Sequence, residues 1–250
     1  MKIIGTIQAR LSSTRLPGKV LKEICGKPML VWHVERLRRS RLLDDVVVAT
    51  TLNSNDDPIV KLCEARDIKY FRGSEDDVLG RVASAIKYFD AETHVEFFGD
   101  SPLTDPHIVD EVVGFYLKNK GRFDYVTNAL KTTYPPGQEV TVYPGRILIE
   151  VDQVVRKDDP MREHVNIHVT QRKDKYRICN LEAPEHYCYP DIYLEVDTLE
   201  DFKFISSIVE HFVKDGRGHF SLAQILEYLL ANPRLIKMNQ DVKRRWKAFK

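Results

Sequence analysis

Apolar and polar positions follow two different periods along the first half of the chain. Short apolar runs rich in β-branched residues predict strands, and segments in which apolar residues recur every three or four positions predict helices. The predicted strands cover residues 2–7, 45–51, 68–71, 93–98 and 123–126, and the predicted helices cover 29–39, 58–66, 77–89 and 107–118. Strands that alternate with helices in this way are typical of a mostly parallel sheet. We therefore expect an α/β domain of the Rossmann-like type.

The pattern changes after the Tyr-Pro-Pro-Gly turn at residues 134–137. Three further strands are predicted at 139–143, 164–170 and 177–181. They lack intervening helices, which predicts a smaller mixed-sheet excursion at about 134–185. The first pattern then returns with a strand at 192–196 and helices at 199–212 and 222–230. A chain of 250 residues can bury one full core, so we expect a single domain over 1–250 with this excursion inside it.

Charge and cysteine content narrow the classes of protein. The 38 basic and 37 acidic residues give a net charge of +1, so we expect no nucleic-acid partner, and any anion site must be a local pocket. The basic end at residues 243–250 is expected to be solvated, with nucleic acid or an anionic membrane as the less favoured alternative. The four cysteines show no C-x-x-C spacing, which favours free thiols. No apolar run is long enough to span a bilayer and no leader is visible, so we expect a cytoplasmic protein without membrane contact.

The segment from Gln8 to Lys19 carries the clearest candidate chemistry. It places two arginines, a lysine, three hydroxyl side chains and a glycine directly after the first apolar run. Ligands of α/β sheets bind beyond the carboxyl ends of the strands, where backbone amides and cationic side chains converge. The segment therefore predicts a polyphosphate site, with an ordinary basic turn as the alternative. It matches neither the Walker spacing nor the G-x-G-x-x-G fingerprint, which counts against a P-loop kinase and a dehydrogenase.

Two aspartates follow predicted strands that lie far apart in the sequence. Asp100 comes after the run at 93–98, and Asp197 comes after the run at 192–196. Mg²⁺ typically takes one or two carboxylates together with phosphate oxygens, so the pair could hold magnesium beside a triphosphate. The alternatives are local: Asp100 could start a turn, and Asp197 could cap the next helix, where Thr198 and Asp201 also form a potential capping box.

Several motifs in order resemble the cytidylyltransferase family. They are the segment 8–21, Gly26-Lys27-Pro28, residues 57–60, 71–81 and 99–106, Arg162-Glu163-His164-Val165, and residues 196–201. The branch that the chain resembles is the spore-coat polysaccharide biosynthesis type, which is related to the enzymes that make CMP-sialic acid and CMP-KDO. The resemblance implies a nucleotidyltransferase fold that is GT-A-like, and a homodimer formed through the excursion.

The resemblance also implies a reaction and a set of residues. A hydroxyl of an acidic sugar would attack the α-phosphorus of CTP, with Mg²⁺ as cofactor, and pyrophosphate would leave. The implied catalytic residues are Lys19, Arg15 and Asp100, and the implied metal ligands are Asp100 and Asp197. The nucleotide would contact Gln8, Ala9, Arg10, Leu11, Ser12, Arg15, Lys19, Ser74 and Asp77. The acceptor sugar would contact Arg162, His164, Gln138 and Glu139.

Some alternatives stay open on the sequence alone. Ser74 and Asp77 could simply begin a helix, and Arg162 and His164 could face solvent. Glu96 stands where the family usually has an arginine, and Pro136-Gly137-Gln138-Glu139-Val140 replaces the commoner Asp-Gly-Leu-Asp-Val, so the acceptor pocket is expected to differ from that of relatives. Alternative functions are a GT-A-type glycosyltransferase, a nucleotidyltransferase for a non-sugar acceptor, and a catalytically silent nucleotide-binding partner.

Overall fold

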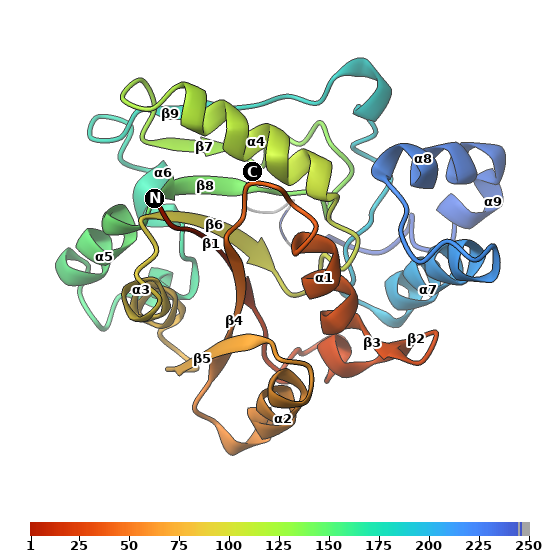
Figure 1. Cartoon of the computed structure of the whole chain (residues 1–250), viewed down its shortest axis with the longest axis horizontal. Coiled ribbons are helices and arrows are strands. Elements are labelled where there is room, and N and C mark those ends of the chain that lie inside the picture. The colour runs from red at the N-terminus through yellow and green to blue at the C-terminus, as the bar shows by residue number, and fades with distance from the viewer. Residues whose placement is uncertain (245, 247–250) are drawn as a thin grey trace.

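A seven-stranded sheet organises the computed structural model, which describes residues 1–244 and Trp246 (Figure 1). The strands are β1 (Ile3–Gln8), β4 (Asp45–Thr51), β5 (Lys69–Gly73), β6 (Thr93–Phe98), β7 (Tyr125–Thr127), β8 (Thr141–Pro144) and β9 (Ile178–Asn180). Their order across the sheet is β5-β4-β1-β6-β8-β7-β9, and β8 alone among them runs antiparallel to its neighbours. The expected α/β fold with a mostly parallel sheet is confirmed.

Helices cover both faces of this sheet because its strands are apolar on both faces. In β1, Ile3 and Ile7 belong to one hydrophobic core and Ile4 belongs to the other. The first core is completed by α1 (Met29–Leu37), α2 (Asp57–Ala65), α4 (Pro106–Lys118), α7 (Leu199–Lys214) and α8 (Leu222–Ala231). The second is completed by α3 (Val78–Tyr88), α5 (Gly145–Val154) and the short α6 (Ile167–Thr170). Helix α9 (Pro233–Ile236) follows α8.

The sheet register brings the strand ends of interest together. Gln8, the last residue of β1, pairs with Phe98, the last residue of β6, and with Ala49 of β4. The segment that leaves β1 and the turn that leaves β6 therefore start side by side, as parallel pairing requires.

Two sequence predictions about secondary structure are wrong. The strand expected at 164–170 does not form: the 3-10 helix Pro160–Glu163 is followed by a turn and then by α6 at Ile167–Thr170. The buried Val165 and Val169 are four positions apart, which is helix spacing, although the β-branched composition favoured a strand. Residues 192–196 are not assigned to a strand: Leu194 and Val196 donate backbone hydrogen bonds to loop residues. Helix α5 was not predicted.

The strands of the predicted excursion belong to the central sheet. β8 and β9 extend it, and the small two-stranded sheet lies elsewhere, between β2 (Glu23–Ile24) and β3 (Lys27–Pro28). The excursion therefore makes one end of the central sheet mixed, because β8 pairs antiparallel with β6 and β7. The role of this segment in dimerisation stays a prediction.

The C-terminal end differs from the expected solvated run. Arg244 is buried, and the Trp246 indole nitrogen donates a hydrogen bond to Glu195. The remaining residues of the run, 245 and 247–250, lie outside the described residues. Within the described part of the chain, no helix is long and apolar enough to cross a membrane, and the four cysteines are free thiols, as expected.

Candidate active site

The segment after β1 is held as a compact loop by its own backbone. The Leu11 amide donates to Asp56 at 2.7 Å, and the Gly18 amide donates to the Leu11 carbonyl at 3.0 Å. Gly18 has a φ of 70°, a left-handed conformation that glycine adopts without steric cost, and the 3-10 helix Lys19–Leu21 begins directly after it. This turn directs the Lys19 side chain back toward the carboxyl ends of β1 and β6.

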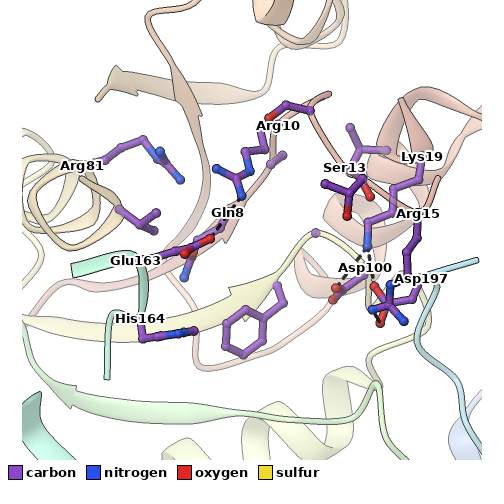
Figure 2. Close-up of a pocket in the computed structure, with 17 residues that line it drawn as sticks. Gln8, Arg10, Ser13, Arg15, Lys19, Arg81, Asp100, Glu163, His164 and Asp197 are labelled. Carbon is purple, nitrogen blue, oxygen red and sulfur yellow. Dashed lines mark hydrogen bonds and ion pairs between the residues drawn. The ribbon is translucent and has the colours of Figure 1, made fainter. Parts of the chain in front are cut away.

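Lys19 meets both predicted metal ligands (Figure 2). Its ammonium nitrogen lies 3.3 Å from Asp100 Oδ2 and 3.1 Å from Asp197 Oδ1, and it donates to the Val196 carbonyl at 2.7 Å. Arg15 Nη2 lies 2.5 Å from the other oxygen of Asp197. The cationic loop and the two acidic turns that the sequence expected to converge therefore do so.

The charges in this cluster reinforce one another. Burial alone lowers the pKa of Lys19, but the negative charges of Asp100 and Asp197 outweigh burial, so its pKa is raised above that of a free lysine. Lys19 is thus fully charged at neutral pH although its residue is only 9% exposed. A fixed, partly desolvated cation of this kind is suited to holding phosphate oxygens.

A cavity of about 400 Å³ opens over the cluster, which is within the usual size of a small-molecule site. Its lining is Gln8, Ala9, Arg10, Ser12, Ser13, Thr14, Arg15, Lys19, Val20, Val78, Arg81, Phe98, Gly99, Asp100, Glu163, His164 and Asp197. In Figure 2 the Lys19 and Arg15 cluster lies at one end, and Arg81 and Glu163 lie at the other. The cavity therefore has one end where Lys19 and Arg15 could bind phosphate groups, and a separate polar end that contains Arg81 and Glu163.

Asp100 and Asp197 fit a magnesium ion. Both carboxylates already contact one cation, the Lys19 ammonium, so they can face a common point. Among the described residues no group of three or more His, Cys, Asp or Glu side chains is gathered for a metal. Magnesium needs no such group, because phosphate oxygens and water complete its shell.

Ser74 and Asp77 do not line this cavity. Asp77 caps α3 by accepting from the Gly80 amide at 2.7 Å, and it also accepts from Arg162 at 2.9 and 2.8 Å. Ser74 accepts from the Asp77 amide. Burial by itself raises the pKa of Asp77. The hydrogen bonds from Arg162 and from the Gly80 amide lower it by more, so its pKa is below the usual value. The structure supports the interpretation of a helix start.

Two of the four predicted acceptor residues are turned into the protein. Arg162 is 2% exposed and pairs with Asp77 and Asp152. Gln138 is completely buried, and its side chain joins the Asp105 amide and the Leu103 carbonyl. Neither lines the cavity above or the second cavity below, whereas His164 lines the first. Local sequence does not distinguish a basic or amide side chain that binds a substrate from one, such as Arg162 or Gln138, that forms hydrogen bonds inside the protein.

A second cavity of about 290 Å³ adjoins the first. The two share Phe98, Asp100 and Asp197. The rest of its lining is Ser101, Ala129, Thr132, Glu139, Glu195 and Trp246. Burial, followed by the charge of Glu139, raises the pKa of Glu195 to about 8. This cavity is the one that a second substrate could enter while touching the same two aspartates.

Glu96 lies beneath the cavity floor and not in an acceptor pocket. Its carboxylate accepts from Gln8 Nε2 at 2.7 Å, from Asn166 Nδ2 at 2.5 Å and from the Tyr143 hydroxyl at 3.3 Å. Burial raises its pKa to about 7, although these three donors lower it part of the way. Glu96 therefore supports the Gln8 side chain from inside the protein.

Several residues that line the two cavities were not predicted as site residues, among them Arg81, Glu163, Glu195 and Trp246. Arg81 and Glu163 stand inside motifs quoted for the family, so that resemblance was the available signal. Glu195 and Trp246 carry no local signal, because an acidic residue before Asp197 and an aromatic residue in a basic tail are both ordinary at a protein surface.

Comparisons with known proteins agree with this geometry. The family model described as cytidylyltransferase matches residues 4–230. An uncharacterized protein of Methanocaldococcus jannaschii is 35% identical over 98% of this chain and 97% of its own length, and the spore coat polysaccharide biosynthesis protein SpsF of Bacillus subtilis is 31% identical over 92% and 95%. The structure of a cytidylyltransferase from Leptospira borgpetersenii is similar, with a TM-score of 0.87 and 31% identity, and the match covers 98% of this chain and all of that one. The chain belongs to the cytidylyltransferase family.

Proposed function

We propose that the chain transfers CMP from CTP to a hydroxyl of a sugar acceptor. The acceptor oxygen bonds to the α-phosphorus, and the bond from that phosphorus to pyrophosphate breaks. The observation that carries the proposal is the meeting of Lys19, Arg15, Asp100 and Asp197 at one end of a cavity large enough for a nucleotide. Nucleotidyl transfer asks a protein mainly for alignment and for neutralisation of phosphate charge, which this cluster supplies.

The ion pairs of Arg15 and Lys19 with the two aspartates indicate what each residue would do. When a triphosphate enters, Arg15 and Lys19 exchange their carboxylate partners for phosphate oxygens, and Lys19 remains nearest to the strand ends. Asp100 and Asp197 are then free to hold Mg²⁺. When bound, Mg²⁺ would polarise the α-phosphate and favour ionisation of the attacking hydroxyl. We propose no covalent intermediate on the protein.

The nucleoside would occupy the other end of the first cavity. There Arg10 Nη2 lies 3.6 Å from Glu163, and the Gln8 amide is fixed by Glu96. Arg81 is 3% exposed, and its guanidinium donates to the Ser74 carbonyl at 2.5 Å. These fixed polar groups are suited to reading the edge of a base, and cytosine is the base that the family implies.

The second cavity would hold the acceptor. The acidic sugar that the resemblance implies would place its carboxylate in a cavity whose described lining carries Glu139 and Glu195 and no basic side chain. Burial keeps Glu195 largely protonated at neutral pH, so repulsion of a substrate carboxylate would come mainly from Glu139. We therefore propose a neutral or amino sugar, which presents hydroxyl or amino groups to these two glutamates and has no carboxylate to place in this cavity.

Pyrophosphate release tests the reaction. Each of the four nucleoside triphosphates would be incubated with Mg²⁺ and with neutral, amino and acidic sugars, including sialic acid and KDO. We expect release with CTP and a neutral or amino sugar. Release with UTP or GTP alone would overturn the choice of base, and release with the acidic sugars alone would overturn the acceptor class. Absence of pyrophosphate with every pair would count against a transferase.

Trp246 gives a matched test of the acceptor cavity. Trp246 lines the second cavity and not the first. Trp246→Ala is therefore expected to raise the KM for the acceptor and to leave the KM for CTP unchanged. Trp246→Phe keeps an aromatic wall and loses only the hydrogen bond to Glu195, so its effect should be smaller. A raised KM for CTP alone would place the acceptor elsewhere.

A further inference from the structure

The C-terminal segment lies against the turn that carries Asp197. Arg15 Nη1 donates to the Lys243 carbonyl at 3.1 Å, and Trp246 donates to Glu195 at 2.7 Å. The Arg244 guanidinium lies over the Tyr193 ring, 4.3 Å from its centroid. These contacts join the C-terminal segment to Arg15, Tyr193 and Glu195, so this segment forms part of the site.

Asp201 connects the segment to the catalytic turn. One of its oxygens accepts from the backbone amides of Asp197 at 3.0 Å and Thr198 at 2.9 Å. The other accepts from Asn239 Nδ2 and from Arg244 Nη2, both at 2.8 Å. Asp201 is completely buried and the Arg244 side chain is 1% exposed. The Thr198 hydroxyl also donates to Asp201 at 3.2 Å, and a buried carboxylate with five donors has one orientation available, which fixes the amides it holds.

The direction of the pKa of Asp201 agrees with this arrangement. Burial alone would raise it, but the hydrogen bond and charge of Arg244, with the backbone and Asn239 donors, lower it below its usual value.

We propose that Arg244 is a positioning residue, which fixes the turn at Asp197 through Asp201 and so sets the position of the carboxylate that faces the magnesium and the triphosphate. The expected effect of Arg244 on CTP binding rests on the proposed function. The expected effect on the turn at Asp197 rests on the hydrogen bonds alone. Groups that orient a metal ligand from outside typically change metal affinity by about 10- to 100-fold when they are removed.

Calorimetric titration with CTP tests the binding consequence. The wild-type protein, Arg244→Ala and Arg244→Lys would each be titrated with CTP in Mg²⁺ and with CTP in EDTA. We expect Arg244→Ala to lose at least about tenfold of the affinity gained from Mg²⁺ while its affinity in EDTA changes much less. Arg244→Lys should lose less, because an ammonium can still pair with Asp201. Arg234→Ala, an exposed arginine on α9, is the matched control and should behave as wild type.

Hydrogen exchange gives a second measurement that needs no nucleotide. The amides of Asp197 and Thr198 should exchange faster in Arg244→Ala than in the wild type, and the amides of β1 should not change. If Arg244→Ala does not fold, the same two measurements on Arg244→Lys decide.

The outcomes separate the two proposals. A wild-type protein whose CTP affinity is equal in Mg²⁺ and EDTA contradicts the proposed function, and the exchange result then decides the inference alone. A folded Arg244 variant with the wild-type gain from Mg²⁺ and wild-type exchange at Asp197 overturns the inference. An equal loss of affinity with and without Mg²⁺ also overturns it, because the residue would then act on the whole protein.

Discussion

At the scale of single residues, Lys19 decides what the site can do. It is the one side chain that contacts both Asp100 and Asp197 among the described residues, and its backbone begins the helix that closes the cationic loop. Asp100 and Asp197 stabilise its positive charge, which under the proposed function would pair with phosphate oxygens. A change at this residue should therefore affect catalysis far more than folding.

Lys19→Ala is expected to lower kcat/KM for CTP by at least about 100-fold, because a fixed charge on the transferring group is lost. The midpoint of thermal unfolding should change little, because Arg15 still pairs with Asp197 and both aspartates reach solvent. Steady-state pyrophosphate release and a thermal melt measure the two effects. Lys61→Ala, on the exposed side of α2, is the control. Near wild-type turnover in Lys19→Ala would refute its catalytic role.

Glu96 predicts a pH dependence of stability. Its pKa is about 7 in the folded protein and near 4.5 when unfolded, so the folded state binds more protons between these values. Stability that Glu96 supplies at pH 5 is therefore lost as the pH rises through 7, by at most about 3 kcal/mol. Glu96→Gln should gain stability relative to the wild type between pH 5 and pH 8. Urea unfolding at both values measures this, and a pH-independent difference would contradict it.

Residue roles were predictable from the sequence where position in the fold decides them. The meeting of the Gln8–Lys19 segment with Asp100 was predictable, because β1 and β6 end at one edge of a parallel sheet. Asp197 joins them although the apolar run before it forms no strand. Asp77 shows the limit: the same carboxylate can cap a helix or contact a ligand, and its partner Arg162 is 85 residues away. Such a partner follows from tertiary packing, which local patterns do not contain.

At the scale of elements, the alternating strands and helices of the first half were predicted correctly, whereas α5 was missed and the segment 164–170 was assigned to the wrong kind of element. The strands at 45–51 and 93–98 have the predicted bounds because they are long, apolar and central. The segment from Pro160 to Thr170 forms two short helices whose ends are fixed by contacts with α3 and α5. Helices this short are stabilised by packing and not by propensity, so the sequence favoured a strand.

Arg162 should act through this segment. Arg162→Ala leaves Asp77 and Asp152 without their main partner, so we expect a loss of about 3 kcal/mol in the free energy of unfolding. Chemical denaturation measures the loss. Arg156→Ala, whose side chain is 82% exposed and pairs only locally, should change stability by less than about 0.5 kcal/mol. Wild-type stability with a raised acceptor KM in Arg162→Ala would restore the acceptor role expected from the sequence.

At the scale of the whole molecule, two adjoining cavities lie at one edge of the central sheet. The first lies over the ends of β1 and β6, and the second lies between the turn after β6 and the C-terminal segment. The order of strands and helices in the sequence predicted a site at the ends of β1 and β6, but not the second cavity. The contribution of the C-terminal segment was not predicted either, because a basic tail has the same composition whether it is solvated or packed.

The homodimer stays a prediction. Light scattering on the purified chain should give twice the mass of 29.0 kDa. If the segment 134–185 forms the contact, the exposed Val154 at the end of α5 is a test position, because Val154→Glu would place a charge in the interface. The variant should be monomeric, and Tyr88→Glu on α3 tests whether a change outside this segment has the same effect. A monomeric wild type would end this expectation.

The charged side chains that line the first cavity almost balance one another. Arg10, Arg15, Lys19 and Arg81 line it together with Asp100, Glu163 and Asp197. At a distance these opposite charges largely cancel, so the pocket exerts little pull on an approaching anion, and encounter should be nearly insensitive to ionic strength. Under the proposed function, a triphosphate would therefore be selected after contact, when its phosphate oxygens replace the carboxylate partners of Arg15 and Lys19.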